Sequence, residues 1–147
     1  MILEDFMAKE LALATAAAFT GAAAYVNVAE QPARLELDDK ALLAQWKPSY
    51  AHGLPMQASL ALTSALFGLL AFWLTRDWRW MLGALVMFAN WPYTFLVILP
   101  VNKRIEATPA QAANRVTREL IETWGRLHAG RSALGLAATL VYVWAAA

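Results

Sequence analysis

The sequence predicts an all-α integral membrane protein, built as a bundle of four transmembrane helices. Its 147 residues are 60% hydrophobic and only 16% charged, and the mean hydropathy is +0.43. This is too apolar for a soluble domain of this size. Three stretches carry no charge and approach the roughly 20 residues that cross a bilayer: Leu11–Ala29, Gly53–Thr75 and Trp80–Asn102. A fourth apolar segment follows, which argues against a soluble bundle of buried helices.

We expect the spans at about residues 8–29, 53–75, 80–102 and 126–146 of a single domain, 1–147. The flank of the first span is acidic, unlike the positive flank of a signal peptide, so we interpret this segment as a true span. Only residues 76–79 join the second and third spans, which predicts an antiparallel helix pair. Tryptophans cluster at this junction, as interfacial anchors do.

The two longer connections, residues 30–52 and 103–125, are expected together at the opposite side of the membrane. Each has the pattern of a short helix. One covers 38–45 and is begun by Asp38, and the other covers 109–122 with Pro109 at its first helical position. Lys and Arg are more frequent on this side, so the positive-inside rule places the long connections in the cytoplasm.

The two halves of the chain show a weak internal similarity. In each half, a span ends with a tyrosine seven residues before a proline, and a Trp-x-x-x-aromatic motif opens the next span. The matching positions are Tyr25 and Pro32 with Tyr93 and Pro100, and Trp46 and Tyr50 with Trp124 and His128. The intervals between proline and tryptophan differ, so chance similarity stays an alternative. A true repeat would be parallel, with the site where the two long connections meet.

The last span carries an arginine. Residues 132–147 are uncharged but too few for a span, so Arg131 must lie within it. Arginine inside a membrane costs at least about 2.5 kcal/mol, less near the end of a span, and usually has a partner or a function. Trp124, His128 and Arg131 share one helical face. Arg131 could form a structural clamp with Glu30, or stay partly free to bind an oxyanion.

His128 is the candidate general base, because the ordinary pKa of histidine lies near neutrality. A neighbouring arginine would favour its neutral form. The plain alternative is a histidine that only forms hydrogen bonds at the interface. A metal site formed by His52, His128 and Glu30 has the right residue types, but no His-x-x-x-His spacing supports it, so we expect no metal and no other cofactor. The absence of cysteine excludes thiol chemistry.

Three motifs resemble the anthrone oxygenase-like family: Tyr25-Val-Asn27-x-x-Glu30-x-Pro32-Ala-Arg34, Pro100-x-Asn102-Lys103-Arg104 and Trp124-x-x-x-His128-x-x-Arg131. These are small four-span membrane proteins of bacteria and fungi, many of unknown function. The resemblance implies a cofactor-free oxygenase that acts on a lipophilic anthrone- or quinol-like aromatic, here in a bacterial inner membrane. Such a substrate and dioxygen would both partition into the bilayer.

In the reaction that this resemblance implies, removing a proton beside the ketone gives an anion that can pass an electron directly to dioxygen. His128 would be the base, and Arg131 and Asn102 would stabilise the oxyanion. A second set of residues would bind the substrate: Tyr25, Asn27, Glu30, Arg34, Trp46, Tyr50, Lys103, Arg104 and Trp124.

Two other functions fit the same residues. One is a non-enzymatic membrane protein that binds or carries a small molecule, or serves as an accessory subunit. The other is a haem or metal electron-transfer protein. Small residues in the first span would allow close helix approach in the bundle or in a homo-oligomer. No basic run indicates nucleic acid.

Overall fold

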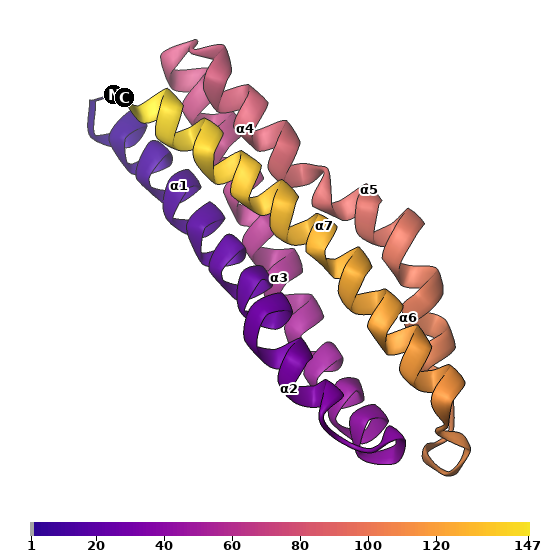
Figure 1. Ribbon diagram of the computed structural model, residues 1–147. Coiled ribbons are helices and arrows are strands. Elements are labelled where there is room, and N and C mark those ends of the chain that lie inside the picture. Colours follow the sequence, from indigo (N-terminus) through magenta and orange to yellow (C-terminus); the bar gives the residue numbers. More distant parts are fainter. Residues whose placement is uncertain (1) are drawn as a thin grey trace.

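The computed structural model, which describes residues 2–147, is a bundle of four long helical rods (Figure 1). The start of α1 and the end of α7 lie at the same end of the bundle. The part of the chain described is all-helical, without strands, which confirms the predicted fold class. The first rod comprises α1 (Ile2–Tyr25), the π-helical η1 (Val26–Glu30) and α2 (Gln31–Leu35). The second rod is α3 (Asp39–Thr75). The third rod comprises α4 (Trp78–Phe88), α5 (Asn90–Tyr93), the π-helical η2 (Thr94–Ile98) and α6 (Leu99–Glu106). A 3₁₀ turn, η3 (Ala110–Ala112), then leads to the fourth rod, α7 (Arg115–Ala146).

All four rods are long and apolar enough to span a membrane, as the sequence predicts. They are longer than expected, however, because most residues of the predicted connections continue the helices. With 37 residues, α3 is about 55 Å long, against a hydrocarbon layer of about 30 Å. This helix is therefore longer than the hydrocarbon layer is thick.

The two short helices expected in the connections are parts of the long rods. The first begins where predicted, with the Asp38 side chain capping the backbone of Lys40 and Ala41, but it runs on into the second span. The second does not begin at Pro109, which precedes only the 3₁₀ turn. Asn114 starts α7 instead, because it forms a reciprocal capping box with Thr117.

Both π-helical segments lie between a tyrosine and a proline of the similar halves. η1 follows Tyr25 and precedes Pro32, and η2 follows Tyr93 and precedes Pro100. A proline in a helix removes one N–H donor and crowds the carbonyl four residues before it. A wide turn at that point relieves the crowding, and such π-bulges are frequent at functional sites. The two stretches thus share a local structure, while the internal repeat stays a prediction.

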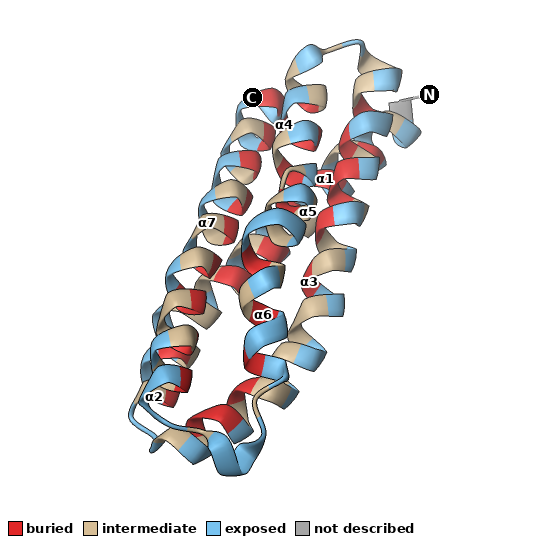
Figure 2. Ribbon diagram, turned by 90° about the vertical axis from the view of Figure 1, so that its right-hand side faces the viewer, coloured by how far each residue is buried: buried red, intermediate tan, exposed pale blue. Residues whose placement is uncertain are grey.

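The interior is divided into two apolar clusters, with buried residues on the inward faces of the rods (Figure 2). The terminal core, near the chain ends, contains Phe19, Trp80 and Tyr142 among its members. The distal core, near α2 and α6, is built around Trp46, Ile105 and Ile121. Several buried polar side chains lie between them, so the site occupies a break in the apolar interior.

The short turn between α3 and α4 closes the terminal end of the bundle. Arg76 adopts a left-handed conformation, with φ of 60°, and ends α3. Asp77 caps α4 and forms an ion pair with Arg79 at 2.8 Å. The hydrogen bond from the Arg79 side chain holds the pKa of the Asp77 carboxyl below its usual value. The antiparallel helix pair predicted from residues 76–79 is therefore confirmed.

Gly68 and Gly83 make room for the Tyr142 ring, which stacks on Trp80. A methyl group at Gly68 would overlap this ring. We expect Gly68→Ala to lower the stability by about 1–3 kcal/mol through overpacking, measured by thermal unfolding in detergent. Gly21→Ala is the matched control, because its added methyl group meets open space. Equal melting temperatures for the two variants would contradict this packing.

Candidate functional site

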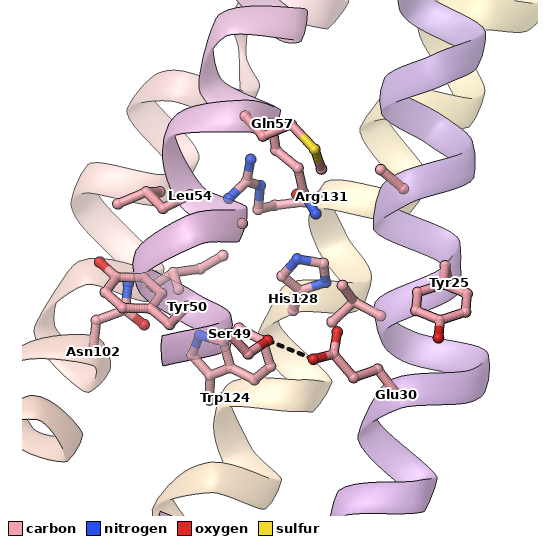
Figure 3. Close-up of a pocket in the computed structure, with 15 residues that line it drawn as sticks. Tyr25, Glu30, Ser49, Tyr50, Leu54, Gln57, Asn102, Trp124, His128 and Arg131 are labelled. Atoms are coloured by element: carbon pink, nitrogen blue, oxygen red, sulfur yellow. Dashed lines mark hydrogen bonds between the residues drawn. The ribbon is translucent and has the colours of Figure 1, made fainter. Parts of the chain in front are cut away.

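A cavity of about 280 Å³ lies between the two cores and is lined by residues of all four rods (Figure 3). His128 and Arg131 reach it from α7, Tyr50 from α3 and Asn102 from α6. Most of the remaining lining is apolar or aromatic. The full lining comprises Ala22, Tyr25, Val26, Glu30, Ser49, Tyr50, Gly53, Leu54, Met56, Gln57, Ile98, Asn102, Trp124, His128 and Arg131.

The structure brings together most of the residues that the sequence singled out. The cavity is lined by Tyr25, Glu30, Tyr50, Asn102, Trp124, His128 and Arg131. Asn27, Arg34 and Trp46 lie behind this lining and contact it. Lys103 and Arg104 do not reach the cavity, because Asn102 faces inward and the next two residues of α6 are exposed.

His128 is oriented by Asn27, which lies on η1. The side chain of Asn27 donates to the Gly125 carbonyl at 2.8 Å, and its oxygen accepts from the Ser132 hydroxyl at 2.8 Å. The same Asn27 oxygen lies 2.9 Å from Nδ1 of His128. An amide oxygen can only accept, so Nδ1 must carry the proton. In neutral His128, Nε2 then bears the free lone pair, and the ring lines the cavity.

Glu30 is committed to a network away from Arg131. Its carboxylate lies 2.5 Å from the Arg34 guanidinium and accepts from Ser49 at 2.5 Å and from Gln45 at 3.1 Å. Asn27 and Glu30 both belong to η1, but one points toward α7 and the other toward α3. The Glu30–Arg131 clamp is therefore not formed, and Glu30 stabilises the junction of the first and second rods instead.

Arg131 is buried without a counter-ion. The residue is 5% exposed, and no residue from 2 to 147 forms an ion pair with it. The guanidinium lies 5.5 Å from the centre of the Phe19 ring, and its Nε has no hydrogen-bond partner. A buried cation in an apolar bundle is costly unless something compensates it. The arrangement therefore suits an anion, or a group that becomes negative, in the cavity.

An aromatic wall forms the distal side of the cavity. Tyr50 stacks on Trp46 with ring centres 4.8 Å apart, and Trp46 meets Trp124 edge-on at 5.5 Å. The Trp124 ring centre is 5.0 Å from that of His128. Such a wall holds flat ligands by stacking. The spacing Trp46-x-x-x-Tyr50 and Trp124-x-x-x-His128 produces it, because residues four apart share a helical face.

Several lining residues were missed by reasoning from the sequence. Ser49, Leu54 and Gln57 line the cavity from α3. Ser49 lies before residue 53, where the second span was expected to begin, whereas Leu54 and Gln57 lie within the expected span. The buried oxygen of Gln57 and both polar side-chain atoms of Asn102 lack partners. The one available indication was the polar character of Gln57 at the start of an apolar span. Buried polar atoms without partners are rare in folded proteins, so these side chains mark the cavity as a functional region.

The alternative metal site is not assembled. His52 is exposed on α3 and lies outside the cavity, whereas His128 is buried. Within the described residues, no three His, Asp or Glu side chains come together as a ligand set.

The different environments of the two buried arginines predict different effects on stability. Arg34→Gln removes the partner of Glu30 and should destabilise the protein by about 2–4 kcal/mol. Arg131→Gln removes an unpaired buried charge and should leave the melting temperature equal to or above that of the wild type. Thermal unfolding of both variants in the same detergent measures the contrast. A large loss of stability in Arg131→Gln would show that Arg131 serves the fold.

The hydrogen bond from His128 to Asn27 predicts a single histidine tautomer. Nitrogen NMR of histidine-labelled protein should show His128 with a protonated Nδ1 and a bare Nε2 at neutral pH. In Asn27→Leu, which keeps the volume but removes the acceptor, the preference should be lost. His52, which is exposed, provides an internal reference of mixed tautomers. An Nε2-protonated His128 in the wild-type protein would contradict this assignment.

The sequence also matches a known family. The profile of the anthrone oxygenase family matches residues 46–141, which include Trp46, Tyr50, Asn102, Trp124, His128 and Arg131 of the site. No curated protein and no solved structure matches the chain. The match covers well over half of the chain and confirms the resemblance to this family. It includes two of the three motifs, and the motif at residues 25–34 lies outside the matched range. This four-helix protein therefore belongs to the anthrone oxygenase family.

Proposed function

We propose that this protein is a membrane-embedded oxygenase that oxidises a lipophilic aromatic substrate of the anthrone or quinol type. The observation that carries the proposal is the pair formed by His128 and Arg131 in one aromatic-walled cavity. Asn27 leaves His128 with a free lone pair on Nε2, and Arg131 is a buried cation without a counter-ion. A base beside an uncompensated cation is what removal of a proton from a neutral, weakly acidic substrate requires.

The first step is proton abstraction. The flat substrate lies against Tyr50 and Trp124, and Nε2 of His128 takes a proton from the acidic carbon of an anthrone or from the hydroxyl of a quinol. The electron pair that remains is shared with the oxygen of the substrate. Arg131 and the side-chain amide of Asn102 stabilise this oxyanion. Each preorganised hydrogen-bond donor in such a site lowers the activation barrier by about 3 kcal/mol.

The second step is oxidation by dioxygen, the co-substrate. For an anthrone, one electron passes from the carbanion to dioxygen, and the resulting superoxide and carbon radical combine in a C–O bond. The peroxide anion takes the proton held by His128 and becomes a hydroperoxide. The second hydrogen then leaves the same carbon as a proton, its electron pair forms the C=O bond, and the O–O bond breaks. The methylene becomes a ketone, and the other oxygen leaves as water. One dioxygen thus accounts for both products.

The position of the site along the bundle suits a lipophilic substrate. Arg131 lies 15 residues before Ala146, or about 22 Å along α7, within a hydrocarbon layer about 30 Å thick. The cavity would therefore lie near the boundary of that layer, on the side of α2 and α6. The excess of Lys and Arg there supports a cytoplasmic orientation for this side. A substrate dissolved in the bilayer could enter without crossing water.

Oxygen uptake with an anthrone or a hydroquinone tests this function. His128→Gln and Arg131→Gln should each lower the rate at least about tenfold, because they remove the base and the oxyanion partner. His52→Gln is the matched control, since His52 is an exposed histidine outside the cavity. Uptake at the uncatalysed rate by folded wild-type protein, together with tight binding of the aromatic compound, would favour a non-enzymatic binding protein instead.

A further inference from the structure

A second cavity of about 280 Å³ adjoins the first one and shares Leu54 and Arg131 with it. It lies between α3 and the third rod, and we call it the side chamber. Pro55, Ala58 and Ala61 line it from α3, and Trp91, Phe95 and Leu99 line it from the third rod. His128 does not reach it.

We propose that the side chamber is the dioxygen site, which takes dioxygen from the lipid and presents it to the substrate at Arg131. This inference rests on the proposed function and adds a separate site for the second substrate. The reacting carbon of the aromatic must lie at Nε2 of His128, and His128 borders only the first cavity. The side chamber has no base, so the aromatic substrate cannot react there.

The lining and depth of the chamber suit an apolar gas. Apart from Arg131, Asn90 and Thr94, its lining is apolar, and apolar cavities in proteins can bind xenon or benzene. Ala61 lies 14 residues before Thr75, about 21 Å along α3, so the chamber is at the level of the hydrocarbon layer. Phe95 is exposed on the outer face of the bundle. Dioxygen, which is more soluble in hydrocarbon than in water, can therefore enter from the side.

Arg131 gives the chamber its chemical role. A guanidinium gains little from neutral dioxygen but attracts superoxide as soon as one electron has moved. An interaction that is stronger after electron transfer than before it lowers the barrier of that step. Because Arg131 borders both cavities, it can contact the substrate oxyanion on one side and the reduced oxygen on the other. The electron transfer, C–O bond formation and release of water then follow as described above.

A lipid chain is the competing occupant, and Arg131 argues against it. Arg131 borders the chamber and is buried without a counter-ion, and an acyl chain offers nothing that compensates its charge. Superoxide, which forms when dioxygen accepts one electron, carries the negative charge that this cation lacks. The buried side-chain oxygen of Asn90 has no partner, but neither an acyl chain nor dioxygen can donate to it, so Asn90 does not distinguish the two occupants.

Two matched variants test the proposal, because each cavity has a lining alanine that can be enlarged. Ala58→Leu reduces the side chamber and should raise the KM for dioxygen at least about threefold, with little change in the KM for the aromatic. Ala22→Leu reduces the first cavity and should raise the KM for the aromatic instead. Initial rates at varied dioxygen and substrate concentrations measure both constants.

An unchanged KM for dioxygen in folded, active Ala58→Leu would overturn the proposal. So would a rise confined to the KM for the aromatic, because the chamber would then hold part of that substrate.

Xenon provides a readout that does not depend on activity. Xenon NMR of the purified wild-type protein should detect a bound site that Ala58→Leu loses and Ala22→Leu keeps. The same gas should inhibit wild-type turnover competitively with dioxygen. Absence of xenon binding in the wild-type protein would overturn the gas site even if the enzyme consumes oxygen. Xenon binding without any oxygen consumption would instead overturn the proposed function and, with it, the assignment of the chamber to dioxygen.

Discussion

A guanidinium without a counter-ion, buried in an apolar helical bundle, is the constraint on which the site depends. Arg131 cannot pair with Glu30, because Arg34, Ser49 and Gln45 already surround that carboxylate. Its positive charge therefore remains uncompensated between two cavities. A protein that retains such a group gives up stability, and the natural reason is a ligand or an intermediate that supplies the missing negative charge.

The wide turn η1 connects this constraint to the rest of the fold. Within five residues it presents Asn27 to α7 and Glu30 to α3, so one segment both orients His128 and holds Arg34 in place. Gln31, which follows directly, donates to the Ile121 carbonyl and further joins the first rod to α7. The two apolar cores on either side hold the rods, and the polar residues between them are free to serve chemistry rather than packing.

The sequence was informative where one helix alone decides the outcome. Four apolar segments, an arginine within the last one, and the shared face of Trp124, His128 and Arg131 all follow from composition and a period of 3.6 residues. The ends of the helices were harder to predict, because charged and proline-containing stretches such as Lys47-Pro48 are typical of loops. They continue as helix here because neighbouring rods pack against them.

By itself, the sequence determined the fold class, the spans, the family and the helix face that bears the site. Only the tertiary structure decided which partner each polar side chain has. It pairs Glu30 with Arg34 rather than Arg131, commits Nδ1 of His128 to Asn27, places Lys103 and Arg104 outside the cavity and opens the side chamber. The physical reason is that helical periodicity specifies which residues share a face, whereas the rotation and register of one helix against another depend on packing among all four.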